Sequence, residues 1–265
     1  LRLALERYNN YEKYVVISGY AGTGKSTLVK FIIEALSSDG IDPEEDVCFA
    51  TYTGKAAQVL LKKGNKNVLT LHKLLYDSIP KANGSFIRIP KSSIDYNIVV
   101  VDEVSMVPKF LIDLLFTHDV FVIALGDPFQ LPPVDKDQDN GLLERPHIFL
   151  DEIMRQALDS EIINLSMQIR KFEPILYKKS NDAIVIPKKE LTTGTLKWAD
   201  QIIVATNKTR IEINNQMRSL LGRGNKPENG DKVICLRNYW NNSVCLPTGS
   251  YSLLLQIIQR CKRSL

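Results

Sequence analysis

Residues 19–26 read Gly19-Tyr20-Ala21-Gly22-Thr23-Gly24-Lys25-Ser26, and this stretch decides the fold of the first half of the chain. It matches the pattern G-x-x-x-x-G-K-[ST] at every fixed position, between an apolar run at 14–18 and an amphipathic stretch at 26–36. Glycines let the backbone direct successive N–H groups at phosphate oxygens, and the following helix adds the positive end of its dipole. The stretch therefore predicts a phosphate-binding loop between a strand and a helix.

The side chains of this loop also predict its ligand. We expect Lys25 to reach the β- and γ-phosphates of a nucleoside triphosphate, and the Ser26 hydroxyl to bind Mg²⁺. A chance glycine-rich loop is the alternative, and the flanking strand and helix argue against it. The residues expected to line the nucleotide site are Gly19, Tyr20, Ala21, Gly22, Thr23, Gly24, Lys25 and Ser26.

Outward from the loop, apolar runs alternate with amphipathic stretches. Fully apolar strands that alternate with helices are typical of a parallel sheet with helices on both faces. We therefore predict an α/β fold of the P-loop NTPase type. The predicted strands lie at 14–18, 47–51, 97–101 and 120–125, with helices at 26–36 and 54–62. In the second half of the chain, we predict a buried strand at 201–206 and an amphipathic helix at 252–262. An insertion at 78–96 contains Asn83-Gly84 between extended residues, which predicts a β-hairpin.

Two acidic residues, Asp102 and Glu103, directly follow the most apolar of these runs. An acidic residue at the carboxyl end of a strand beside a phosphate loop can hold Mg²⁺ through water, and Asp102 fits that role. We expect Glu103 to orient and deprotonate the attacking water, so the pair predicts hydrolysis of the nucleotide. The alternative is that the pair caps a helix beginning near 107–108.

Gln130 lies in the segment Gly126-Asp127-Pro128-Phe129-Gln130-Leu131-Pro132-Pro133, which follows the next buried run. A glutamine there can sense the γ-phosphate and couple it to a neighbouring loop. Taken alone, the segment is an ordinary proline-rich turn.

Composition limits the classes of protein that remain. The chain has 265 residues with 34 Lys+Arg against 30 Asp+Glu, a net charge of +4 that permits a nucleic-acid partner without arguing for one. Four cysteines show no C-x-x-C spacing, which favours free thiols in a reducing compartment and a cytoplasmic location. No apolar run approaches the roughly 20 residues that cross a bilayer, so we expect no membrane association.

The order of these motifs resembles that of superfamily 1 helicases, nearest to the RecD/TraA-like group that moves 5′ to 3′ on single-stranded DNA. The resemblance implies a first RecA-like domain at 1–149, which includes the hairpin, and a partial second one with an irregular end at 150–265. The late helicase motifs are absent, which implies a truncated chain. The matching segments are 19–26, 53–57, 70–72, 102–106, 126–133, 150–156 and 205–210.

Carried over residue by residue, the resemblance implies that Gln130 couples the γ-phosphate to DNA and that Arg155 is an arginine finger from the second domain. Without the family, Arg155 reads as a surface charge on a helix. Thr53, Lys55 and His72 would line the DNA track, although His72 alone is equally consistent with a packed or capping histidine.

Relatives insert a duplex-splitting wedge where this chain has its predicted hairpin. Phe86 near its tip would stack on a base or, alternatively, pack the hairpin onto the sheet. Lysines at 171, 178, 179, 188 and 189 would contact phosphates, but such runs are usually solvated faces.

As a whole, the resemblance implies an ATP-dependent DNA helicase that uses Mg²⁺ and acts on single-stranded DNA and on junctions of single- and double-stranded DNA. Nuclease or other repair subunits are candidate partners. The missing motifs favour an alternative, a nucleotide- and DNA-binding module or an ATPase without unwinding activity. In relatives, a glutamine-containing segment before the first strand recognises adenine. Residues 1–13 of this chain contain no glutamine, so no selectivity for adenine is predicted.

Overall fold

The computed structural model describes residues 1–80, 86–152, 160–234, 239–241, 244–246 and 251–253. The chain divides into two compact units, Leu1–Ala157 and Leu158–Leu265. Each unit is described here by itself.

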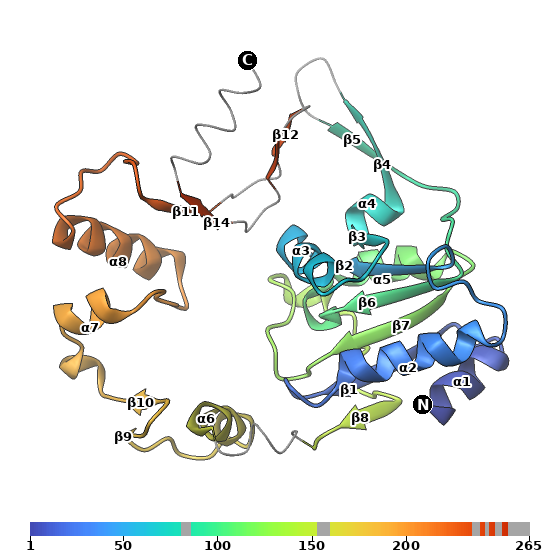
Figure 1. The fold of residues 1–265 in the computed structure, drawn as a ribbon, viewed down its shortest axis with the longest axis horizontal. Coiled ribbons are helices and arrows are strands. Elements are labelled where there is room, and N and C mark those ends of the chain that lie inside the picture. Colours follow the sequence, from blue (N-terminus) through green and yellow to red (C-terminus); the bar gives the residue numbers. More distant parts are fainter. Residues whose placement is uncertain (81–85, 153–159, 235–238, 242–243, 247–250, 254–265) are drawn as a thin grey trace. The chain divides into compact units, whose positions relative to one another are not determined.

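A six-stranded sheet with the strand order β3-β2-β6-β7-β1-β8 forms the centre of the first unit (Figure 1). Every neighbouring pair in it is parallel. This arrangement confirms the predicted α/β fold. The strands are β1 (Tyr14–Gly19), β2 (Val47–Thr51), β3 (Val68–Thr70), β6 (Ile98–Asp102), β7 (Phe121–Gly126) and β8 (Ile148–Leu150).

Helices cover both faces of this sheet. Alternate residues of a strand point to opposite faces, so one strand contributes side chains to the core on each side. Val15 and Ile17 of β1 belong to the core under α1 (Arg2–Asn9) and α2 (Lys25–Ser37). Val16, between them, belongs to a second core with buried residues of α4 (Leu71–Leu75) and α5 (Lys109–Phe116). The continuous apolar runs in the sequence reflect these two cores.

The predicted hairpin is present in the first unit. Strand β4 (Tyr76–Pro80) pairs antiparallel with β5 (Phe86–Pro90), from Tyr76 opposite Pro90 to Pro80 opposite Phe86. Its strands begin two residues before the predicted segment 78–96 and end before it does. Residues 81–85, which include Asn83-Gly84, lie outside the described residues.

The second unit has a different composition of elements. Its described strands form three antiparallel pairs, and Leu196 is its only described residue with a buried apolar side chain. The elements are α6 (Glu161–Arg170), β9 (Lys178–Lys179), β10 (Ile184–Val185), η4 (Lys188–Glu190), α7 (Thr193–Trp198), α8 (Asn207–Leu220), β11 (Lys232–Ile234), β12 (Tyr239–Asn241), β13 (Val244–Leu246) and β14 (Tyr251–Leu253).

Two predictions for the second unit are wrong. The apolar run at 201–206 forms no strand, and the Ile203 side chain is 86% exposed. A buried strand requires neighbouring strands and a covering layer, and neither is present around this run in the described part of the unit. The helix predicted at 252–262 is replaced at 252–253 by strand β14, and its remainder lies outside the described residues.

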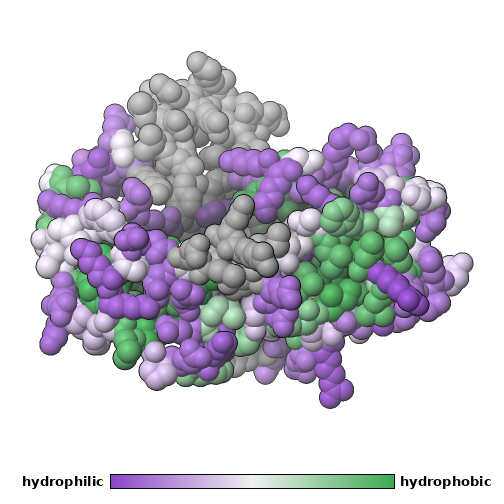
Figure 2. Space-filling model, turned by 60° about the horizontal axis from the view of Figure 1, so that its bottom comes forward, coloured by the Kyte–Doolittle hydropathy of each residue, from purple (hydrophilic) through white to green (hydrophobic). Residues whose placement is uncertain are grey.

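The surface of the first unit is partly apolar. Hydrophobic residues gather on the right of Figure 2, whereas polar residues cover much of the remaining visible surface. Exposed apolar side chains in this unit include those of Leu3, Phe31 and Phe149. The helices of the unit therefore leave part of its apolar surface uncovered.

Two predictions from composition concern the cysteine thiols and membrane association. Cys48 is free and fully buried, and burial raises the pKa of its thiol to about 12, so the thiol is unreactive. Among the helices of the described residues, none has the length and apolar character needed to cross a membrane.

His147 anchors the edge strand β8 to β1. The Val16 N–H donates to His147 Nδ1 at 2.9 Å, and the His147 N–H donates to the Val16 carbonyl at 3.0 Å. Nδ1 accepts this bond only when it carries no proton. Burial and the nearby Arg7 both lower the pKa of His147, although Glu12 opposes them.

We expect acid to weaken this anchor. Because the folded-state pKa of His147 lies below the unfolded-state value of about 6.5, its contribution to stability is complete above about pH 6.5 and is lost as the pH falls through the folded-state pKa. The urea concentration at the midpoint of unfolding should therefore be lower at about pH 5.5 than at about pH 7.5. His147→Asn, which offers a non-titrating oxygen near the position of Nδ1, should show a smaller fall. Equal falls in the two proteins would contradict this account.

Candidate nucleotide-binding site

The phosphate loop, residues 19–26, connects β1 to α2. Gly22 and Gly24 have φ angles of 79° and 87°, in the left-handed region that glycine enters without steric cost. Gly24 directly precedes the first helical residue, Lys25. Glycine is therefore required here by backbone conformation, and the N-terminus of α2 opens onto the loop as predicted.

Gly19 has a different reason to be glycine. A Cβ atom there would lie 2.5 Å from the Leu150 carbonyl oxygen and 2.9 Å from Thr23 Oγ1. The Tyr20 N–H donates to the same Leu150 carbonyl at 3.3 Å, and Thr23 Oγ1 donates to the Tyr20 carbonyl at 2.8 Å. The start of the loop is thus packed against β8.

The Lys25 side chain is directed back to the start of the phosphate loop. Its Nζ donates to the Gly19 carbonyl at 2.7 Å and to the Tyr20 carbonyl at 2.9 Å. Ser26, one residue further, lines a cavity of about 240 Å³ together with Asp102 and Lys63. The loop therefore carries one ammonium group and one hydroxyl at its helical end.

Asp102 ends strand β6, and Glu103 follows it in a left-handed conformation with φ 55° and ψ 47°. Asp102 Oδ1 accepts a hydrogen bond from the Glu103 N–H at 3.0 Å. Burial raises the pKa of both carboxyl groups, and the charge of Lys25 opposes this in both. The pair does not cap α5, whose N-cap residue is Pro108 and which has no side-chain cap. The helix-capping alternative is therefore wrong.

Gln130 reaches the acidic pair from the segment after β7. Its side chain lies close to that of Glu103 and lowers the pKa of Glu103. Fully buried Asp127 holds this segment, since its Oδ1 accepts from the Phe129 N–H at 3.0 Å and its carbonyl accepts from the Gln130 N–H at 3.1 Å. The turn thus presents Gln130 to Glu103.

The structure therefore brings together Lys25, Asp102, Glu103 and Gln130, four side chains that the sequence predicted for one site. They come from the ends of three adjacent strands, β6, β7 and β1. Sequence reasoning missed Lys63, whose charge lowers the pKa of Asp102. Lys63 follows the helix α3 (Gly54–Lys62), and no local signal marks it.

The residues at this site fit Mg²⁺. Ser26 and Asp102 line one cavity and offer a hydroxyl and a carboxylate oxygen, which are ligands that Mg²⁺ accepts. In the described residues no three His, Cys, Asp or Glu side chains cluster as a metal site. Few protein ligands are typical of Mg²⁺ sites that are completed by water and substrate phosphates.

The predicted DNA-contacting residues lie near the ends of β2 and β3. Thr53 is the N-cap of α3, where its Oγ1 accepts from the Ala56 N–H at 3.3 Å, and Lys55 is exposed in the first turn. The half-buried His72 ring lies 5.9 Å from the Tyr52 ring and 6.1 Å from the Tyr76 ring. Burial and the charge of Arg88 lower the pKa of His72.

Other predicted site residues are less completely placed. Arg155 lies outside the described residues, so its role as an arginine finger stays a prediction. Phe86 begins β5, and its side chain is not among the described ones. All five lysines at 171, 178, 179, 188 and 189 are exposed, and Lys178 forms an ion pair with Glu161.

Residues 2–183 match the protein family described as AAA domain. The chain belongs to this family. Among curated relatives, the chain is 29% identical over 147 residues to the ATP-dependent DNA helicase dda of Enterobacteria phage T4, and the match covers 53% of this chain and 33% of that protein. It is 33% identical over 157 residues to the ATP-dependent RecD2 DNA helicase of Deinococcus radiodurans, which covers 57% of this chain and 21% of that one.

Solved structures of similar proteins include Pif1 helicases. Pif1 from Bacteroides sp. in complex with ADP-AlF4 is 21% identical with a TM-score of 0.47, covering 94% of this chain and 62% of that chain. Pif1 from Candida albicans is 17% identical with a TM-score of 0.47, covering 99% and 70%. The curated relatives confirm the resemblance to superfamily 1 DNA helicases. The chain described here spans about a fifth to a third of the length of these relatives.

Glu103→Gln should separate nucleotide binding from turnover in this AAA-domain protein. The amide keeps the size of the side chain but cannot take a proton from water, so we expect turnover to fall at least about 100-fold with nucleotide affinity within about two-fold of wild type. A fluorescent-nucleotide titration beside a phosphate-release assay measures both. Glu34→Gln makes the same chemical change at an exposed position of α2 and serves as the control. Equal turnover in the two variants would remove Glu103 from the mechanism.

Proposed function

We propose that this chain is the ATP-hydrolysing motor part of a DNA helicase of the RecD-like type, which moves 5′ to 3′ on single-stranded DNA. The observation that carries the proposal is the convergence of Lys25, Asp102, Glu103 and Gln130 at the ends of adjacent strands. The names of the curated relatives, which are DNA helicases, support DNA as the substrate. We extend the proposal to cytoplasmic repair complexes that contain nuclease or other subunits.

The geometry supports a mechanism for the hydrolytic step. The N–H groups of the loop and the Lys25 ammonium bind and orient the phosphates. Ser26 and Asp102 would hold Mg²⁺, which neutralises charge that develops on the transferring phosphoryl group. Glu103 accepts a proton from the attacking water. Gln130, close to Glu103, would keep that carboxylate aimed at the water.

The proposal assigns the remaining predicted residues to the moving parts of the motor. Arg155 would supply positive charge to the phosphoryl group as part of the second RecA-like domain that the family resemblance implies at 150–265. Thr53, Lys55, His72 and Phe86 would contact single-stranded DNA, with the hairpin at the junction with duplex. Lys55 is exposed, and the half-buried His72 ring lies beside two tyrosine rings.

One observation favours the alternative of an ATPase without unwinding activity. The described part of the second unit contains only antiparallel strand pairs, and Leu196 is its only described residue with a buried apolar side chain. A lobe that closes on ATP and moves DNA requires a packed core of its own.

Lys25→Ala tests the motor and the alternative together. We expect loss of DNA-stimulated phosphate release by at least about 100-fold, because the only charged side chain of the loop is removed. The wild-type chain should displace a strand from a substrate with a 5′ single-stranded tail and not from one with a 3′ tail. Lys109→Ala, at an exposed position of α5, controls for loss of a surface charge. Hydrolysis without displacement would favour the alternative, and hydrolysis by Lys25→Ala would overturn the proposal.

Lys55→Ala tests the DNA track. If Lys55 contacts one phosphate, its loss should weaken binding to single strands of any sequence and lower the salt dependence of log K by about 0.7. Binding measured by fluorescence anisotropy at several salt concentrations gives that slope. Lys62→Ala, in the last turn of the same helix, is the control. Unchanged slopes in Lys55→Ala would remove this lysine from the track.

A further inference from the structure

We propose that Asn140 is a positioning residue for Glu103, which it holds through the short 3-10 helix η1 (Val104–Met106). This inference rests on the proposed role of Glu103 in hydrolysis. Asn140 lies between β7 and β8, and neither the predicted motifs nor the family resemblance assigns it a role.

Glu103 needs external support because its backbone conformation is unfavourable. Its φ of 55° is in the left-handed region, where an L-residue other than glycine brings Cβ too close to the following carbonyl. Such a residue persists when the surrounding structure holds it. The residues that follow supply part of that support, since the Met106 N–H donates to the Glu103 carbonyl at 3.2 Å.

The Asn140 amide supplies further support to this segment. Its Nδ2 donates to the Val104 carbonyl at 2.9 Å and to the Val107 carbonyl at 2.7 Å, one at the start of η1 and one just after its end. Its Oδ1 accepts from the Leu142 N–H at 3.0 Å. Both amide hydrogens and the amide oxygen are therefore used. No charged or hydroxyl side chain of similar size offers this combination.

The loop around Asn140 is built to present the amide. Asp139 Oδ1 accepts from the Gly141 N–H at 3.0 Å, and Gly141 has a φ of 68°, which suits glycine. Gln138 Oε1 accepts from the Phe110 N–H at 3.4 Å, at the start of α5. Hydrogen bonds to this loop therefore hold the segment between η1 and α5 at both of its ends.

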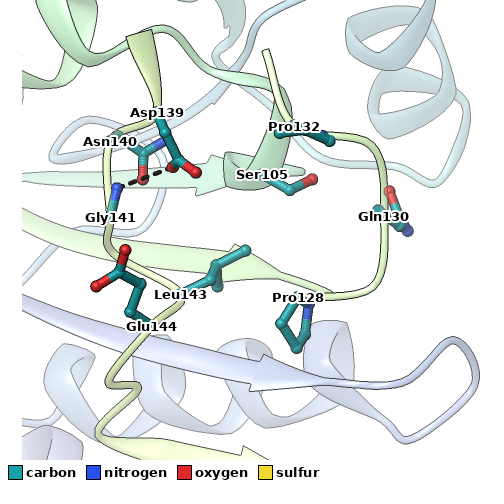
Figure 3. Close-up of a pocket in the computed structure, with 9 residues that line it drawn as sticks. All are labelled: Ser105, Pro128, Gln130, Pro132, Asp139, Asn140, Gly141, Leu143 and Glu144. Carbon is teal, nitrogen blue, oxygen red and sulfur yellow. Dashed lines mark hydrogen bonds between the residues drawn. The ribbon is translucent and has the colours of Figure 1, made fainter. Parts of the chain in front are cut away.

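A cavity beside η1 explains why these bonds matter. It measures about 250 Å³ and is lined by Ser105 of η1, by Gln130 and by Asn140 (Figure 3). Ser105 Oγ is buried and finds no hydrogen-bond partner among the described residues. Close packing normally fixes a buried segment, but on this side η1 faces open space. Hydrogen bonds from Asn140 therefore restrain η1 where packing does not.

Asn140→Asp removes the restraint with almost no change in volume. The carboxylate keeps the acceptor for Leu142 but puts an oxygen against the carbonyls of Val104 and Val107. We expect η1 to shift and Glu103 to turn away, which lowers kcat for ATP hydrolysis by about 10- to 100-fold. Nucleotide affinity should stay within about two-fold of wild type, because none of these bonds involves residues 19–26.

Asn67→Asp is the matched control. The Asn67 amide also bridges two carbonyls, those of Glu44 and Val47, at the start of strands β2 and β3. It lies at the opposite edge of the sheet from the ends that carry the site. This variant makes the same chemical change, and urea unfolding measures the loss of stability in both variants. We expect it to retain wild-type kcat.

The deciding experiment measures kcat and nucleotide affinity in Asn140→Asp, Asn67→Asp, Glu103→Gln and the double variant with Asn140→Asp. A loss of kcat confined to Asn140→Asp, and absent when it is added to Glu103→Gln, supports a role that acts through Glu103. Equal kcat in the two asparagine variants would overturn the proposal. So would an equal loss of nucleotide affinity and kcat, or a full further loss in the double variant. Failure of the proposed function is distinct, since Glu103→Gln would then hydrolyse ATP at the wild-type rate.

Discussion

The parallel pairing of β6, β7 and β1 is the constraint on which the site depends. Strand β7 lies between the other two, with Val101 opposite Ala124 and Ser18 opposite Gly126. Because all three strands run in one direction, their carboxyl ends meet at one edge of the sheet, where ligands bind in open α/β folds. The phosphate loop, the acidic pair and the Gln130 segment therefore meet without any long excursion of the chain. All six residues of β7 are buried, so this alignment cannot shift without loss of both cores.

Charge at this edge is balanced by a small number of contacts. The carboxyl groups of Asp102 and Glu103 are both shielded from water, and burial alone favours their neutral forms. Lys25 opposes that effect in both groups, Lys63 and a backbone N–H oppose it for Asp102, and Gln130 opposes it for Glu103. Each carboxylate thus has its own partners in addition to the shared lysine. This division of partners matches the two different roles proposed for the pair.

Much of the first unit follows from local sequence, and the exceptions have a physical reason. The runs at 47–51 and 54–62 predict β2 and α3 at their observed bounds, because apolar period and helix capping are local properties. The contact of Asn140 with Val104 joins residues 36 positions apart, which no local pattern encodes. Likewise, nothing in the sequence marks the left-handed conformation of Glu103. The run at 201–206 shows the reverse case, because an apolar pattern becomes a strand only when neighbours pair with it.

Strand order also places the proposed DNA contacts on the edge that carries the nucleotide site. Thr51 lies opposite Asp102 in the ladder of β2 and β6, and its Oγ1 donates to the Thr53 carbonyl at 3.0 Å. Helix α3 begins beside Thr53 and ends at Lys62, so that Lys63 sits where its charge acts on Asp102. One short helix therefore has the proposed DNA track at its first turn and, near its last turn, the carboxylate proposed to bind Mg²⁺. Since a helix moves as a rigid element, any displacement of its first turn also moves the lysine that follows it, which gives this fold a direct physical connection between the two sites.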